Sequence, residues 1–129
     1  MTKTRKAVTL MEILLVVVLV GIIAAFGIPS YTKSIERADA REAADNLRMI
    51  ASAMELYRTE EGGYPVGLPQ VVNINTVLNL NIIEQNMDYN CTTAAGYTCT
   101  AVVSSGGWAI EIVAGGDPVC SFGACPPFP

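Results

Sequence analysis

The sequence contains no histidine, and its 8 Lys and Arg residues are outnumbered by 12 Asp and Glu residues, which gives a net charge of −4. Histidine is the usual general acid or base near neutral pH and a common metal ligand. The chain also lacks a nucleophile elbow, a glycine-rich phosphate loop followed by lysine, and a Cys-x-x-Cys pair. These absences argue against an enzyme and against zinc or haem attachment, and the acidic balance argues against direct nucleic-acid binding.

The main feature present is an apolar run from Val8 to Ile28, about 21 residues, or roughly 31 Å as a helix, which is long enough to cross a bilayer. Residues 1–7 carry three cations and no acid. By the positive-inside rule this end stays in the cytoplasm and the rest is exported. The competing interpretation is a cleaved secretory signal, but the run is longer than a usual signal and leads into a helical pattern without a small-x-small cleavage site.

Glu12 stands five residues into this run, where a charge costs several kcal/mol unless it is paired. One explanation is structural: Glu12 is stabilised by the positive end of the helix dipole or extends its carboxylate to the membrane interface. The other explanation is functional: the Glu12 carboxylate pairs with a positive charge on another chain.

The residues around Glu12 carry a specific resemblance. The stretch Lys6-Ala7-Val8-Thr9-Leu10-Met11-Glu12, together with Gly21 and Ile28-Pro29-Ser30-Tyr31, resembles the signature of type IV prepilins and type II secretion pseudopilins. The resemblance implies cleavage after Ala7 by a prepilin peptidase and methylation of the new amino terminus at Val8. Ala7 and Val8 replace the family's usual Gly and Phe, so we expect slower processing rather than none. Cleavage removes three cations and changes the net charge from −4 to −7.

The resemblance also implies that Glu12 neutralises the amino terminus of a neighbouring subunit in an assembled filament. Pro29 lacks a backbone donor, so with Gly21 and Gly27 it predicts a kink or local unwinding of the helix, and hence flexibility. The alternative is that these small residues permit close helix packing, and both can hold.

An amphipathic helix is predicted over residues 30–62, because apolar residues recur at spacings of three and four and Gly62-Gly63 is a stop signal. Together with residues 8–29 it makes one helix of about 54 residues. Its charged face is either simply solvated or contacts neighbouring subunits.

Residues 63–129 predict a small β-rich head. Residues 71–83 indicate a connecting loop with a short helix or strand. Residues 97–103 and 108–114 predict an antiparallel hairpin around a Gly-containing turn. In its second strand Trp108, Ile110, Ile112 and Ala114 share one face, which we expect to pack on the long helix. A third strand is expected near Val119.

All four cysteines lie in this exported head, which favours two disulfides. Four cysteines allow three pairings, and sequence proximity favours Cys91 with Cys99 and Cys120 with Cys125. Asp117, in Gly115-Gly116-Asp117-Pro118, is read as a turn residue. Because major pseudopilins bind calcium in this region, the resemblance makes Asp117 a weak candidate metal ligand.

The predicted fold class is therefore α+β, pilin-like, with a long N-terminal helix and a small antiparallel sheet. We expect a non-enzymatic subunit, single-pass in the bacterial inner membrane, that polymerises with copies of itself into a type IV pilus for adhesion, twitching motility or DNA uptake. Its expected partners are the prepilin peptidase and the inner-membrane assembly platform. The alternatives are a periplasmic pseudopilin of type II secretion, with calcium as its cofactor, and a membrane-anchored binding module that never polymerises; a pilin is expected to need no cofactor.

Overall fold

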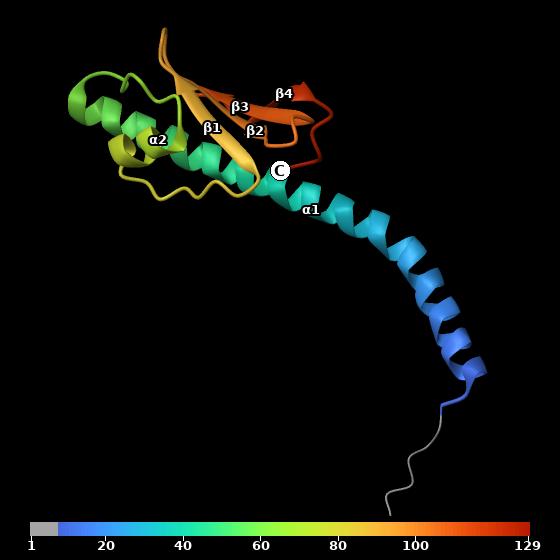
Figure 1. Cartoon of the computed structure of the whole chain (residues 1–129). Coiled ribbons are helices and arrows are strands. Elements are labelled where there is room, and N and C mark those ends of the chain that lie inside the picture. The colour runs from blue at the N-terminus through green and yellow to red at the C-terminus, as the bar shows by residue number, and fades with distance from the viewer. Residues whose placement is uncertain (1–7) are drawn as a thin grey trace, which may run out of the picture. The chain divides into compact units, whose positions relative to one another are not determined.

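The computed structural model describes residues 8–129. Its first element, α1, is one helix over Leu10–Glu61, 52 residues, which confirms the predicted single long helix (Figure 1). The helix ends where Gly62 adopts a left-handed φ of 79° and its N–H bonds the Arg58 carbonyl at 3.0 Å. Glycine makes this conformation without a steric penalty, which is why the helix stops at this residue.

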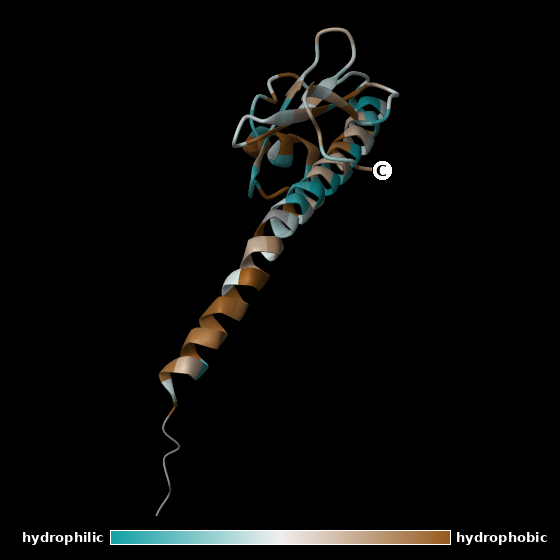
Figure 2. Ribbon diagram, turned by 90° about the vertical axis from the view of Figure 1, so that its right-hand side faces the viewer, coloured by the Kyte–Doolittle hydropathy of each residue, from teal (hydrophilic) through white to brown (hydrophobic). Residues whose placement is uncertain are grey.

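The chain divides into two compact units, Met1–Ile35 and Glu36–Pro129, so the second half of α1 belongs to the same unit as the sheet. The reason is visible in the burial of the second half of α1, where Ala40, Ala43, Leu47 and Ile50 are fully buried. This half is part of the head, because its apolar stripe forms one side of the head's core. Figure 2 shows the change in hydropathy along α1, from apolar residues all round to a mixture of apolar and polar ones.

The head contains one antiparallel sheet of four strands in the order β1-β2-β3-β4. The strands are β1 (Met87–Thr92), β2 (Thr98–Val103), β3 (Trp108–Val113) and β4 (Val119–Gly123). The β2–β3 hairpin and the strand near Val119 are confirmed. Strand β1 was not predicted from the sequence.

The face of β3 that packs toward α1 is the predicted one. Trp108, Ile110 and Ile112 are buried in the same core cluster as Leu47 of α1. Ala114, expected on this face, lies beyond the end of the strand and is exposed, so the prediction was wrong for that residue.

The segment between α1 and the sheet contains α2 (Val71–Leu78), so of the two alternatives for residues 71–83 the short helix is the one that forms. Asn79 ends it in a left-handed conformation, with φ of 51°. The Asn75 side chain then binds the Ile82 backbone twice, accepting from its N–H at 2.9 Å and donating to its carbonyl at 2.8 Å. These bonds explain how asparagine, which disfavours long helices, stabilises a short one here.

Two disulfides close short loops: Cys91–Cys99 joins β1 and β2, and Cys120–Cys125 joins β4 to the segment that follows it. These are the pairings that sequence proximity favoured. The first is buried in the core and the second lies at the surface of the head.

Candidate assembly site

The first unit presents an apolar surface with nothing packed on it. From Val8 to Ile28 the exposed fractions of its large apolar side chains run from 50% at Val16 to 90% at Leu10. The helix is long and apolar enough to cross a membrane. A surface of this size is not left in water, so lipid or other protein chains must cover it.

The start of α1 is fixed by Thr9. The Thr9 hydroxyl accepts a hydrogen bond from the Glu12 backbone N–H at 3.3 Å, and the Thr9 carbonyl accepts from the same N–H at 3.1 Å. Thr-Leu-Met-Glu therefore has the spacing of a capping box, with threonine capping and glutamate three residues later. This local role of Thr9 was missed in the sequence, although the signal was present.

Within residues 8–129 the Glu12 carboxylate has no hydrogen-bond or ion-pair partner. The acid therefore lies beside the exposed start of the helix, one turn from Val8, with its oxygens available to another group. Ala7 and the predicted leader, residues 1–7, lie outside the described residues. The pairing of Glu12 with a neighbouring amino terminus stays a prediction.

Gly21, Gly27 and Pro29 lie inside continuous helix, and the structure describes no unwound residue between them. No heavy atom lies within 4 Å of a Cβ built at either glycine, so neither is required by packing within this chain. Just beyond Pro29 the Thr32 and Ser34 hydroxyls donate to the carbonyls four residues earlier, at 3.2 and 3.0 Å. Such bonds weaken the helical ladder, but the flexibility of this segment stays a prediction.

Asp117 is exposed on the turn before β4. Across residues 8–129 no three His, Cys, Asp or Glu side chains come together as metal ligands. Calcium takes six to eight oxygen ligands, backbone carbonyls among them, so the role of Asp117 as a metal ligand stays a prediction.

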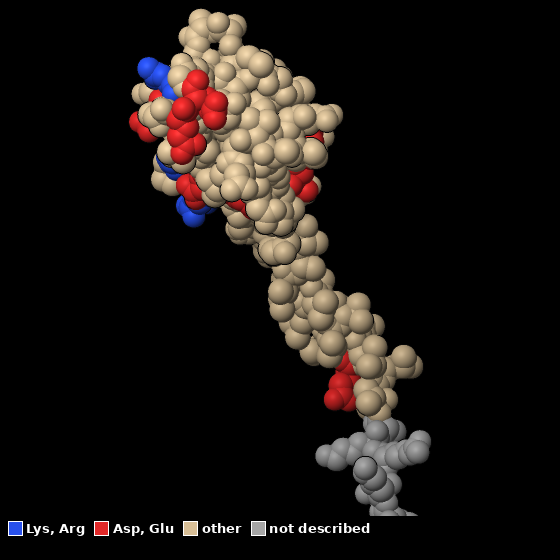
Figure 3. Space-filling model, turned by 90° about the vertical axis from the view of Figure 1, so that its left-hand side faces the viewer, with Lys and Arg blue, Asp and Glu red and all other residues tan. Residues whose placement is uncertain are grey.

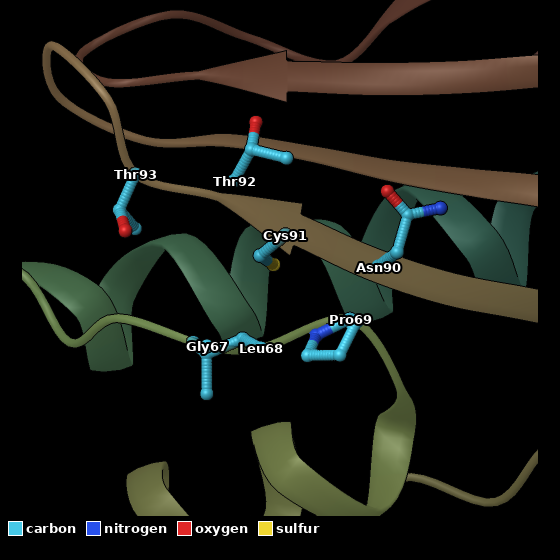
Figure 4. A pocket seen from close by; sticks show the side chains of 7 residues that line it. All are labelled: Gly67, Leu68, Pro69, Asn90, Cys91, Thr92 and Thr93. Carbon is cyan, nitrogen blue, oxygen red and sulfur yellow. The ribbon is translucent and has the colours of Figure 1, made fainter.

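A hollow of about 640 Å³ lies between the loop before α2 and the end of β1 (Figure 4). Its polar side chains are Asn90, Thr92 and Thr93, next to Leu68 and Pro69. None of the seven residues that line this hollow is charged.

A protein-family model described as "Type IV minor pilin ComP, DNA uptake sequence receptor" matches residues 29–112, which run from α1 into β3. The chain belongs to this family of type IV pilins. It is a structural subunit of the pilin and pseudopilin kind, as the resemblance around Glu12 predicted. Family members assemble into filaments with other pilin subunits.

The chain is also similar to type II secretion system core protein G. It is 34% identical to the Vibrio cholerae protein over 67 residues, 50% of this chain and 46% of that protein. It is 28% identical to the Escherichia coli protein over 79 residues, 59% of this chain and 54% of that protein. The chain thus spans about half the length of these curated relatives. No solved structure matches it.

Proposed function

We propose that this chain is a subunit of a type IV pilus, polymerising through the apolar first half of α1. The observation that carries the proposal is the match of a type IV minor pilin family across residues 29–112. That match begins after the apolar run of residues 8–28 and covers the rest of α1, α2 and the sheet as far as β3. Adhesion, twitching motility and DNA uptake are the proposed uses of the filament.

The exposed residues of the first unit support polymerisation. Burying a large apolar side chain among neighbours contributes about 1.5 to 3 kcal/mol. The Glu12 carboxylate, without a partner in residues 8–129, would take the amino terminus of a neighbour at Val8 after prepilin peptidase removes the leader at Ala7. Two charges that meet in an apolar filament core are tolerated only as a close pair, so the contact would set the register between subunits.

A pseudopilin of type II secretion is the second candidate, favoured by the similarity to core protein G. The match of the type IV minor pilin family across residues 29–112 favours the pilus over this candidate. Before assembly either subunit would be a single-pass protein of the inner membrane, with its N-terminus in the cytoplasm.

The test is intact-mass spectrometry of the chain in two fractions of its native host, filaments sheared from the cell surface and the remaining envelope. We expect abundant chain in the sheared fraction, lacking Met1 to Ala7 and carrying a methyl group on Val8. Processed chain confined to the envelope would assign it to a pseudopilus. Unprocessed chain in both fractions would contradict both candidates and leave a membrane-anchored module.

A further inference from the structure

Charges of opposite sign lie on opposite flanks of α1 within the head. At about 100° per residue, the side chains at positions 37, 41 and 48 fall within about 40° of one another. Positions 39 and 42 lie about 180° and 120° from the middle of that group, and the buried stripe through Ala43 and Leu47 lies between the two flanks. We define the basic flank as Arg37, Arg41 and Arg48.

The arginines of the basic flank have few acidic partners within their own chain. Arg37 has no acid three or four residues away, and its neighbours at that distance include Lys33 and Arg41. Like charges four residues apart destabilise a helix. Across residues 8–129, neither Arg37 nor Arg41 has an acidic partner within 4.0 Å, whereas Arg48 pairs with Asp45 at 3.0 Å. Both unpaired arginines are exposed.

The acidic flank, Asp39, Glu42 and Glu84, lies on the β1 side of the head. Asp39 and Glu42 of α1 line a small hollow with Ile83, Gln85, Asn86 and Met87, and Glu84 belongs to the same loop before β1. Burial is the main cause that raises the pKa of Tyr89, and all three of these carboxylates raise it further. They therefore lie close enough to act on one phenol. Across residues 8–129 none of the three has a basic partner within 4.0 Å.

The two flanks lie on opposite sides of the head, beside the two edges of the sheet. Tyr89 on edge strand β1 is hydrogen-bonded to Asn46, next to the acidic flank. The tail that follows the other edge strand, β4, reaches Arg48, whose Nη2 donates to the Pro129 carbonyl at 2.6 Å. The acidic flank therefore borders one edge of the sheet and the basic flank borders the other. Figure 3 shows acidic and basic side chains on one face of the head.

We propose that the basic flank of one copy docks on the acidic flank of the next copy, forming the lateral contact between heads in the filament. The inference deepens the proposed function and depends on it. Its occupant is a second copy because the two flanks are complementary in charge and lie at the same level of α1. Residues 36–129 carry four arginines against eleven carboxylates, so copies repel one another unless specific pairs form.

A contact with this geometry would generate a filament when it is repeated. The two flanks are different surfaces, so the contact is heterologous rather than self-complementary. A repeated heterologous contact that does not close into a ring generates an open helix. Charge pairs of this kind set orientation and exclude wrong partners as well as contributing affinity.

To test this contact, full-length variants are expressed in a host strain that lacks the chain. The amount of each variant is then measured in the sheared-filament fraction and in the envelope fraction. Arg37→Glu with Arg41→Glu reverses the basic flank, and Glu42→Arg with Glu84→Arg reverses the acidic flank. We expect each pair to lower the sheared fraction about tenfold, while the amount in the envelope stays unchanged. Combining all four substitutions restores opposite charges across the contact and the original net charge, so we expect filaments to return.

Two further variants separate this explanation from general effects. Glu61→Arg with Asp117→Arg makes the same change in net charge as the acidic-flank reversal at exposed positions outside both flanks, and is expected to assemble normally. Arg37→Gln with Arg41→Gln keeps long helix-compatible side chains, so its expected loss of filaments cannot come from unfolding.

Filaments that tolerate either flank reversal, or a four-substitution variant that does not recover, would overturn the lateral contact while leaving the pilus proposal standing. Absence of the unmodified chain from sheared filaments would overturn both. Unchanged filaments that lose binding to a double-stranded DNA fragment in the Arg37→Glu, Arg41→Glu variant would assign the basic flank to nucleic acid instead.

Discussion

The Asn46 side chain donates a hydrogen bond through Nδ2 to the Tyr89 hydroxyl oxygen at 2.9 Å, joining α1 to the edge strand β1. Tyr89 is 3% exposed. Replacing Tyr89 by Phe keeps the ring and leaves the Asn46 amide without this partner, which costs about 1 kcal/mol. The free energy of unfolding can be measured in detergent through the fluorescence of Trp108, which is the only tryptophan and is buried in β3.

The matched control for that substitution is Tyr57→Phe, a half-buried tyrosine of α1 for which the structure gives no hydroxyl hydrogen bond within residues 8–129. It should change stability by a few tenths of a kcal/mol at most. Equal losses for Tyr57→Phe and Tyr89→Phe would show that the Asn46 contact contributes nothing specific.

Stability should fall at alkaline pH because of two tyrosines. Burial raises the pKa of Tyr89 above its ordinary value of about 10, and burial with the nearby Glu55 charge raises the pKa of Tyr97. Above pH 10 the unfolded chain loses these protons while the folded chain retains them, so the free energy of unfolding decreases as pH rises. Below pH 10 both states are protonated and neither group contributes a pH dependence. Thermal unfolding followed at Trp108 from pH 8 to 11 should show this decrease, and Tyr89→Phe should reduce its slope.

Gly123 ends β4 in a position that no other residue fits. Its φ is 72°, and a Cβ there would collide with the backbone carbonyl of Gly107, the residue directly before β3. Gly123→Ala should therefore destabilise the head by more than about 2 kcal/mol, since the left-handed φ alone costs about 1 to 2. Gly106, with φ of 74° and no atom within 4 Å of its built Cβ, is the control for the cost of a left-handed φ without a collision. If Gly106→Ala costs as much in urea unfolding, then the collision at Gly123 has no effect.

The elements that the sequence predicted correctly are those encoded by local pattern. The spacing of Leu47, Ile50 and Met54 and the stop at Gly62 define α1, and β-prone residues on each side of a turn define the β2–β3 hairpin. Strand β1 was missed because Asp88 and Asn90 are poor strand formers. Its buried residues Met87, Tyr89 and Cys91 nevertheless alternate strictly, which was the available signal.

The residues of the candidate sites also fall into two groups, those that the sequence could indicate and those that it could not. Glu12 could be singled out from the sequence because a charge in an apolar run is a local anomaly. The acidic flank could not, since only the path of the chain between α2 and β1 brings the loop that contains Glu84 beside Asp39 and Glu42. Nothing in the spacing of residues 39, 42 and 84 indicates that proximity.

The two disulfides should differ in their contributions to stability. By loop closure, bridges spanning 8 and 5 residues contribute roughly 2.5 and 2 kcal/mol at 25 °C. Cys99 is fully buried whereas Cys120 is exposed, so replacing Cys91 and Cys99 by Ala also disturbs core packing. In denaturant unfolding, that double variant should lose more stability than Cys120→Ala with Cys125→Ala. The reverse order would mean that the C-terminal loop, rather than the β1–β2 pair, limits the stability of the head.

Glu12 should be needed for assembly and not for folding. Replacing it by Gln keeps the size and the hydrogen-bonding capacity of the side chain but removes the charge that would pair with a neighbour's amino terminus. Breaking a buried ion pair by removing one partner costs about 3 to 5 kcal/mol, so we expect the sheared-filament fraction to fall at least tenfold. The head contains none of the affected contacts, so its unfolding in detergent, followed at Trp108, should not change. Glu61→Gln, an exposed acid at the other end of α1, is the control. Normal filaments from the Glu12→Gln chain would show that its charge has no role in assembly and would favour a cap at the start of the helix as its only function.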